Sequence, residues 1–236
     1  MRLAGEIHRG LVPEIDSGDG EFEFYGRSWP SGEVGGDLVD LVQSEWGWLA
    51  YVADVSGHGV PAGVLMTMMK SAARTRLSAV GPSSFLPAIN QTLIPLSQPS
   101  MYLTLAFLNY SAGVMKFSTA GHVPILHYQQ ESREVEERFV GNYPLALLGD
   151  VQFEVSQIGS QPGDLFVILT DGLTEVVDDG DHDLGLAPLK AVLARNAAAP
   201  LCEVARQLRE CALRHGKQLD DQTLLLVRRR SPNGRR

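Results

Sequence analysis

Aspartates stand at the boundaries of four apolar segments in this sequence. The stretch WLAYVA runs into Asp54, and the stretch LFVILT runs into Asp171. Asp37 opens another apolar stretch after two glycines, and the pair Asp220–Asp221 opens the last one. An ionised carboxylate beside a buried sheet is costly unless it is paired or binds a metal. Residues of this type in these places therefore indicate cation binding.

No basic side chain lies near Asp54 or Asp171 in the sequence. Lysine and arginine are absent from residues 44–64 and from residues 161–181. If Asp54 and Asp171 converge, a divalent cation is the simplest group that holds them together. Carboxylate, carbonyl and water oxygens favour Mg²⁺ or Mn²⁺ over Zn²⁺. An aspartate before glycine is also common in turns, so the metal interpretation depends on the four positions taken together.

The elements that must position these carboxylates follow from hydrophobic periodicity. Residues 46–54 carry apolar side chains on both faces of a predicted strand, as expected where a sheet is covered on both sides. Runs of strands alternate with pairs of helices, and this order predicts the α+β class. We predict strands over 21–29, 37–44, 46–55, three segments within 101–129, 151–158, 164–170 and 222–229. We predict helices over 3–11, 62–77, 83–94, 185–195 and 201–215.

Composition and charge exclude several classes of protein. The chain has 236 residues, 44% of them hydrophobic, so a disordered chain is excluded. No apolar run approaches the ~18 residues of a membrane span, and the first residues lack the apolar stretch of a signal peptide. The net charge is −8, and it becomes −13 without the five arginines of residues 228–236. An acidic body of this kind is a poor match for nucleic acid, and we expect a cytoplasmic location.

Five segments carry a family resemblance in their order and spacing. They are GEVGGDLVDL (32–41), VADVSGHGVPAGVLM (52–66), STAGHVPIL (118–126), LTDGLTE (169–175) and DDQTLLLV (220–227). Together they resemble the metal-dependent protein Ser/Thr phosphatases, the PPM or protein phosphatase 2C-like superfamily. The similarity is greatest to the bacterial branch typified by the stage II sporulation protein E and RsbU phosphatases. The resemblance covers residues 10–228 and implies an α-β-β-α sandwich of two antiparallel sheets flanked by helices.

The resemblance also implies a metal-ligand set. Asp54 would bridge two divalent cations, Mn²⁺ or Mg²⁺, and the backbone carbonyl of Val55 would bind the second. Asp37 matches an acidic position on the side of the second ion, and Asp171 matches the aspartate of a TDG motif on the first. Asp220 best matches the last metal aspartate, and Asp221 is the neighbour that could replace it. Asp37, Asp54 and Asp171 are the predicted catalytic residues.

Three further residues are weaker candidates for substrate binding. His58 lies in the turn after Asp54, and His122 lies in the segment AGHVP. Each of them is either a substrate-side histidine or a hydrogen-bonding turn residue. Arg27 is a loose match to an arginine that holds phosphate in eukaryotic members, and a surface arginine on a strand is the plainer interpretation. The acidic run of residues 178–183 is a flap over the site, a loop for a third metal, or a solvated loop, and the solvated loop is the plainest interpretation.

The function that the resemblance implies is hydrolysis of phosphoserine or phosphothreonine on a protein by a metal-activated water. Residues 1–229 would form the phosphatase domain and residues 230–236 a basic, disordered tail. The branch implies a phosphorylated anti-sigma-factor antagonist as substrate in a bacterial signalling switch, and a sensor domain or regulatory partner. Two alternatives stay open: a non-catalytic regulator of the same fold that binds a partner protein, and a small-molecule phosphoesterase.

Overall fold

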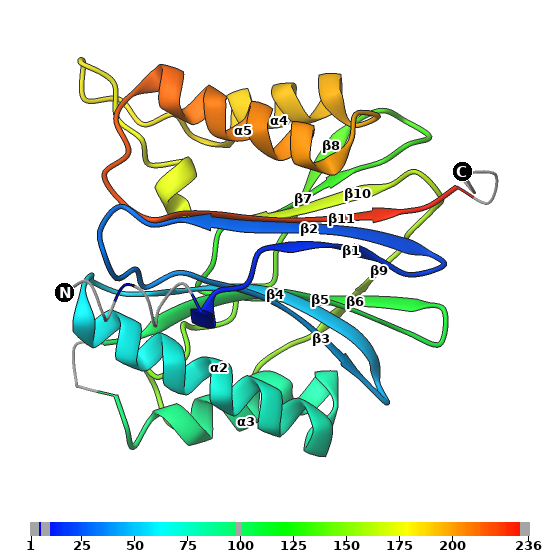
Figure 1. The fold of residues 1–236 in the computed structure, drawn as a ribbon. Coiled ribbons are helices and arrows are strands. Elements are labelled where there is room, and N and C mark those ends of the chain that lie inside the picture. The colour runs from blue at the N-terminus through cyan, green and yellow to red at the C-terminus, as the bar shows by residue number, and fades with distance from the viewer. Residues whose placement is uncertain (1–4, 6–9, 98–100, 232–236) are drawn as a thin grey trace.

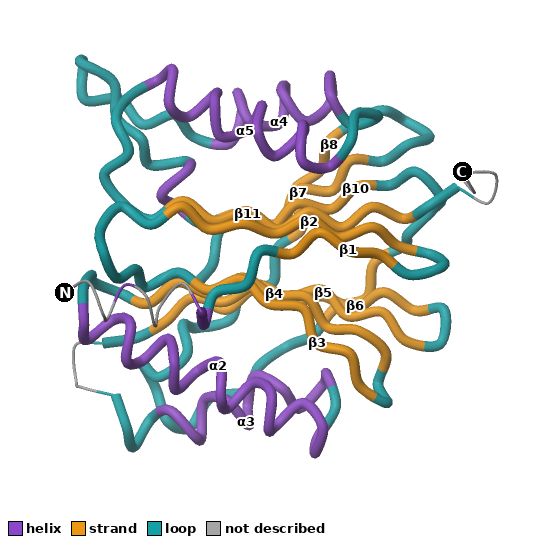
Figure 2. The backbone as a smooth tube through the Cα atoms, in the orientation of Figure 1, coloured by secondary structure: helices purple, strands orange, loops and turns teal. Residues whose placement is uncertain are grey.

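Two antiparallel sheets lie face to face between two pairs of helices (Figure 1 and Figure 2). The computed structural model describes residue 5, residues 10–97 and residues 101–231. Helices α2 (Val60–Val80) and α3 (Phe85–Leu93) cover one sheet, and helices α4 (Leu186–Asn196) and α5 (Leu201–His215) cover the other. The predicted α-β-β-α sandwich is confirmed.

The strand order brings distant parts of the chain side by side. The sheet under α4 and α5 has the order β1 (Ile15–Gly18), β2 (Phe22–Trp29), β11 (Gln222–Arg229), β10 (Leu165–Leu169), β7 (Ile125–Tyr128), β8 (Val135–Arg138). The sheet next to α2 and α3 has the order β3 (Leu38–Ser44), β4 (Gly47–Val55), β5 (Leu103–Ser111), β6 (Val114–Ala120), β9 (Ser156–Ile158). Short 3-10 helices follow α2 (η1, Pro82–Ser84) and β10 (η2, Asp171–Leu173).

Three apolar layers hold this sandwich together. One layer lies between the two sheets, and it contains Phe24, Val52 and Leu225. The other two lie between each sheet and its helices. In β11, Leu224 and Leu226 face the helices whereas Leu225 faces the opposite sheet. This alternation explains why the strands are apolar on both faces, as the sequence predicts for residues 46–54.

The predicted elements differ from the observed ones mainly at the sheet edges. Strands β1 and β8 are missed by the prediction, and of residues 151–158 only the last three form a strand. The sequence of β1, IDSG, buries only Ile15, and the strand exists because it pairs with β2. Such edge strands take their conformation from a neighbour rather than from their own periodicity. Most of the helix predicted over residues 3–11 lies outside the described residues.

Helix α2 begins and ends at glycines with backbone angles that favour glycine. Gly59 precedes it with φ of 79°, and Gly81 follows it with φ of 69°. Pro61 stands in its first turn, where a proline is well tolerated. The turn GHGVP therefore fixes where the chain leaves β4 and enters the helix. Among the described helices, none is both long and apolar enough to cross a membrane.

Candidate metal centre

The predicted site residues come together at one edge of both sheets. Asp54 lies near the end of β4 and Asp37 directly before β3, and these strands are antiparallel neighbours. Asp171 directly follows Thr170 at the end of β10, and Asp220–Asp221 directly precede β11, its antiparallel neighbour. Antiparallel pairing thus places the end of one strand beside the start of the next. The edge lies at the left-hand ends of the sheets in Figure 1.

Asp221 is buried and its carboxylate holds the loop before β3. Its Oδ1 accepts hydrogen bonds from the backbone N–H of Ser31 (2.7 Å) and from the Ser31 hydroxyl (3.1 Å). Its Oδ2 accepts one from the backbone N–H of Gly36 (2.8 Å). A Cβ atom on Gly35 would lie 2.3 Å from the same oxygen, so the close approach requires glycine there. Both oxygens of Asp221 are therefore engaged by the protein itself.

Asp220 is exposed and is placed differently. Its Oδ1 accepts a hydrogen bond from the backbone N–H of Asp221 (2.7 Å). The charge of Asp220 contributes to raising the pKa values of Asp54 and Asp171, so the Asp220 carboxylate is close enough to act on both of them. The turn that carries it packs tightly against the TDG segment, because a Cβ atom on Gly172 would lie 2.0 Å from the backbone oxygen of Asp221.

Asp37 is the most enclosed of these carboxylates. It is 2% exposed, and the hydroxyl of Thr170 donates a hydrogen bond to its Oδ2 (2.9 Å), which links the two sheets. Burial raises the pKa of Asp37 well above its usual value, and the charge of Asp54 raises it further. Hydrogen bonds from Thr223 and Thr170 oppose these effects and lower the pKa.

Asp54 lies between the carboxylates of the two sheets. Burial raises its pKa to about 7, and the charges of Asp171 and Asp220 contribute in the same direction. The pKa of Asp171 is raised by burial and by the charge of Asp220. The leading charged groups in these shifts are all carboxylates, so each ionised member destabilises the others. A cation among them would remove this repulsion.

The donor set fits hard divalent cations. The backbone oxygen of Val55 lies close to Gly36, since a Cβ atom there would be 2.9 Å from it. Carbonyl and carboxylate oxygens are the ligands that Mg²⁺ and Mn²⁺ prefer. Among the described residues, no group of three or more acidic, histidine or cysteine side chains could hold an ion by itself. Such ions keep several waters as ligands, so these carboxylates would hold an ion together with waters and backbone oxygens.

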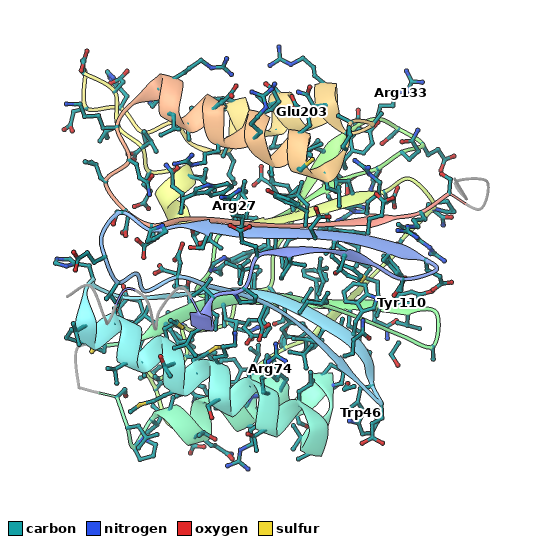
Figure 3. The ribbon with its side chains drawn as sticks, in the orientation of Figure 1. Arg27, Trp46, Arg74, Tyr110, Arg133 and Glu203 are labelled. Carbon is teal, nitrogen blue, oxygen red and sulfur yellow. The ribbon has the colours of Figure 1, made fainter. Side chains whose placement is uncertain are left out.

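Among the described residues, none of the three further candidates hydrogen-bonds to a carboxylate of the cluster. His122 is 4% exposed, and its Nδ1 lies 2.7 Å from the hydroxyl of Thr104, the cross-strand neighbour of Asp54. Burial lowers the pKa of His122 to about 4, so it is neutral at pH 7. This environment favours its structural interpretation. His58 is exposed in the turn before α2. Arg27 pairs with Glu14 (3.2 Å) on the side of β2 that faces α5 (Figure 3).

The structure adds residues that the motifs did not single out. Thr170, inside the motif of residues 169–175, donates a hydrogen bond to Asp37, and Ser31, directly before the motif of residues 32–41, donates to Asp221. Glu175 joins the acidic cluster, because burial and the charges of Asp171 and Asp183 raise its pKa. Asp183 belongs to the acidic run that the sequence presents as a solvated loop. The signal for Thr170 was its place directly before the TDG aspartate.

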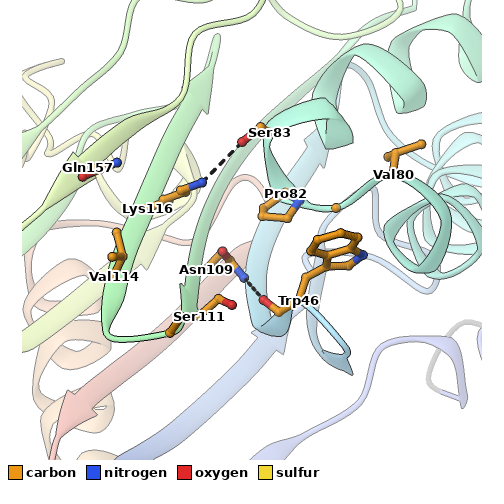
Figure 4. A pocket seen from close by; sticks show the side chains of 11 residues that line it. Trp46, Val80, Pro82, Ser83, Asn109, Ser111, Val114, Lys116 and Gln157 are labelled. Atoms are coloured by element: carbon orange, nitrogen blue, oxygen red, sulfur yellow. Dashed lines mark hydrogen bonds between the residues drawn. The ribbon is translucent and has the colours of Figure 1, made fainter.

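A separate cavity of about 410 Å³ lies at the other end of β4 (Figure 4). Trp46 and Pro82 lie on one side of it, and Lys116 donates a hydrogen bond to Ser83 (3.5 Å) across it. Lys116 is the charged residue among those that line it. None of the predicted site residues lines this cavity.

Comparison with known proteins gives the family. A model described as Stage II sporulation protein E (SpoIIE) matches residues 44–230. The chain belongs to the SpoIIE family. It is 26% identical over 235 residues to the phosphoserine phosphatase RsbU of Bacillus subtilis, covering 98% of this chain and 70% of that protein. The predicted membership of the SpoIIE/RsbU branch and the prediction of a phosphatase are confirmed.

Solved structures agree with this family assignment. The SiaA-PP2C domain of Pseudomonas aeruginosa matches with a TM-score of 0.82 and 20% identity over 96% of this chain and 94% of that one. The RsbU and RsbW domains of a Mycobacterium tuberculosis protein match with a TM-score of 0.77 and 26% identity, over 94% of this chain and 62% of that one. The catalytic domain of the serine threonine protein phosphatase PstP in complex with 2 manganese ions has the same fold, with a TM-score of 0.67 at 17% identity, over 89% of this chain and 99% of that one.

Proposed function

We propose that this chain hydrolyses phosphoserine or phosphothreonine on a protein substrate at the carboxylate edge. The observation that carries the proposal is the convergence of Asp37, Asp54, Asp171 and Asp220 from both sheets. A phosphate group is an anion, so an acidic site of this kind accepts it only together with cations. The similarity to a phosphoserine phosphatase supports the same reaction.

Two divalent cations, Mn²⁺ or Mg²⁺, would supply an activated water and neutralise the phosphate oxygens when bound. Asp54 would hold both ions, because it lies between the aspartates of the two sheets. Asp171 and Asp220 would hold the first ion. The backbone oxygen of Val55 would hold the second, with Asp37 on its side. The related PstP domain with its manganese ions supports this cofactor assignment.

Hydrogen bonds within the chain would hold residues of this site in place. Asp221 holds the loop of residues 31–36 against the start of β11. Thr170 donates to Asp37 and keeps its charged form oriented between the sheets. These contacts would fix Asp37 and the loop before β3 before any ion binds, and this limits the reorganisation that binding requires. Stabilisation of developing charge by such preorganised groups is a large part of catalysis in sites of this class.

We further propose a phosphorylated anti-sigma-factor antagonist as the substrate, in a bacterial signalling switch in the cytoplasm. The similarity to RsbU supports this assignment, as does the solved structure that joins RsbU and RsbW domains. A sensor domain or a regulatory partner would control the activity. The division into a phosphatase domain over residues 1–229 and a basic tail over residues 230–236 stays a prediction, and most of the tail lies outside the described residues.

The test is phosphate release from matched substrates. Phosphoserine and phosphothreonine peptides, a phosphorylated antagonist protein and a panel of nucleotides are assayed with Mn²⁺. We expect turnover of the phosphoprotein and the peptides. With the nucleotides, we expect no hydrolysis that depends on Asp54. A preference for nucleotides would replace the proposal with a small-molecule phosphoesterase. Binding of the phosphoprotein without release by the intact site would replace it with a non-catalytic regulator.

A further inference from the structure

A cavity lined by two arginines lies beside the carboxylate edge. Its volume is about 570 Å³, and its wall includes Arg27, Trp29 and Arg209. A second cavity of about 390 Å³ shares these three residues, so they form a ridge between two hollows. Arg27 and Trp29 come from the outer face of β2, and Arg209 comes from helix α5. We call the larger of these two cavities the arginine pocket.

The two guanidinium groups both lie over the indole ring of Trp29. The Cζ atom of Arg209 is 4.7 Å from the ring centroid, and that of Arg27 is 5.5 Å from it. Stacking on an aromatic ring holds an arginine in place but leaves its N–H groups free at the edges. The ring therefore brings two like charges close together, and burial and the charge of Arg27 lower the pKa of Arg209.

Arg209 lacks an anionic partner in the described part of the chain. Its Nη2 donates to the side-chain oxygen of Gln218 at 3.3 Å. Its Nε is buried and has no hydrogen-bond partner among the described residues. A buried charged donor without a partner is destabilising. Arg206, one turn away on the same helix, is in contrast neutralised by Glu203 and Glu210.

Glu14 already occupies the other arginine. Its Oε1 lies 3.2 Å from Arg27 Nη2, and its side chain is 73% exposed. The cavity of about 570 Å³ thus has one carboxylate in its wall, that of Glu14. Glu210, in the wall of the second cavity, is paired with Arg206, so Arg209 stays open for another carboxylate. An exposed ion pair of this kind is weak, so a second carboxylate could compete for Arg27. The net charge of −8 also means that an acidic segment binds only where the local charge is positive.

The arginine pocket is physically connected to the carboxylate edge. The side-chain N–H₂ of Gln218 donates to the backbone oxygens of Trp29 (2.7 Å) and Asp220 (3.1 Å). Gln218 thus links the wall of the pocket to the backbone of a proposed metal ligand. A peptide with its phosphate at the edge can therefore reach this pocket with the residues that flank the phosphate.

We propose that the arginine pocket docks an acidic segment of the protein substrate, whose Asp or Glu carboxylates flank the phosphorylated residue. Arg209 receives one carboxylate, and Arg27 receives another in place of Glu14. The proposal rests on the proposed function for its substrate. The docking proposal goes beyond the proposed function because it names the acidic residues beside the phosphorylated residue as the feature that sets substrate specificity.

The test compares two phosphoserine peptides of equal length, one with Asp and Glu around the phosphoserine and one with Asn and Gln. The measured quantity is the ratio of kcat/KM for the acidic peptide to that for the neutral peptide. We expect Arg209→Gln to lower this ratio about tenfold, as for loss of a charge-assisted hydrogen bond. We expect Glu14→Gln to raise it severalfold, because Arg27 loses its competitor. Arg195→Gln, which removes an exposed arginine of α4, is the matched control and should keep the wild-type ratio.

A second readout separates this proposal from the proposed function. Binding of a fluorescently labelled acidic peptide with unphosphorylated serine is measured by anisotropy, which needs no turnover. We expect Arg209→Gln to weaken binding of this peptide about tenfold. If Arg209→Gln melts at a lower temperature than the wild type, Arg27→Gln is measured in its place, and we expect the same loss of affinity. Equal ratios and equal affinities in wild type, Arg209→Gln and Glu14→Gln would overturn the docking site. If the wild type binds the peptide but hydrolyses neither substrate, the proposed function fails and the docking site stands.

Discussion

Adjacent aspartates at the start of β11 have different environments in this protein. Asp221 is buried and accepts three hydrogen bonds from the loop before β3, whereas Asp220 is exposed beside Asp54 and Asp171. The two carboxylates therefore differ in burial and in hydrogen bonding. In the sequence they are equivalent, and only the alignment of DDQT with the family ending favoured Asp220.

The first prediction separates these two residues. Asp220→Ala should abolish phosphate release and weaken Mn²⁺ binding while the protein keeps its fold. Asp221→Ala should lower the stability to unfolding by roughly 2–3 kcal/mol, because buried N–H groups of the loop lose their acceptor. Both variants are measured by metal titration and by thermal melting. If Asp221→Ala loses the metal and keeps its stability, the assignment is off by one residue.

The second prediction concerns Asp54→Asn. This change keeps the volume and removes the charge between the two sheets. Turnover should fall by at least ~10²-fold, in the range seen when groups that stabilise transition-state charge are removed. The variant should fold normally, as judged by circular dichroism. Turnover near that of the wild type would show that Asp54 is only a turn residue.

The third prediction concerns the pH dependence of the metal-free protein. The pKa of Asp54 is raised to about 7 in the folded state, so the folded protein binds a proton there that the unfolded chain has released. The folded state is therefore favoured below the unfolded value of about 4, and this contribution is lost as the pH rises to 7. In EDTA, the melting temperature should fall over this range, and Asp54→Asn should reduce the fall. An identical pH profile for the variant would contradict the raised pKa.

At the scale of elements, long segments could be predicted and edges could not. The helix over 201–215 matches the structure because its apolar positions recur every three to four residues. The strand over 222–229 matches because it contains a short continuous apolar run, as a strand buried on both faces does. The prediction missed β1 and β8, which have few buried residues and depend on pairing. The four strand-end aspartates were visible in the sequence, but the contacts of Thr170 and Ser31 were not, because each joins elements far apart in the chain.

The fourth prediction tests how η2 packs against the start of β11. Gly172→Ala would place a Cβ atom 2.0 Å from the backbone oxygen of Asp221, so the turn of Asp220 and Asp221 must move. We expect a loss of stability of roughly 1–3 kcal/mol and reduced affinity for Mn²⁺. Gly159→Ala is the matched control, since a Cβ atom there meets nothing within 4 Å. Equal Mn²⁺ affinity in both variants would show that this contact does not position the metal ligands.

At the scale of the whole molecule, two sheets from distant parts of the chain build one edge. Asp37 and Asp54 come from one sheet and Asp171 and Asp220 from the other, so the site exists only when the sheets pack together. The apolar layer between the sheets therefore positions the carboxylates as well as stabilising the fold. The sequence could predict the two halves of the site from strand ends, and their convergence followed only from the family resemblance.

The most direct test of the account is the metal dependence of phosphate release. The protein is treated with EDTA, freed of chelator, and assayed on a phosphoserine peptide before and after addition of Mn²⁺ or Mg²⁺. We predict no release without the ions, recovery when either ion is added, and no recovery in Asp54→Asn. Full activity in a rigorously metal-free sample would contradict the proposal that these aspartates act through divalent cations.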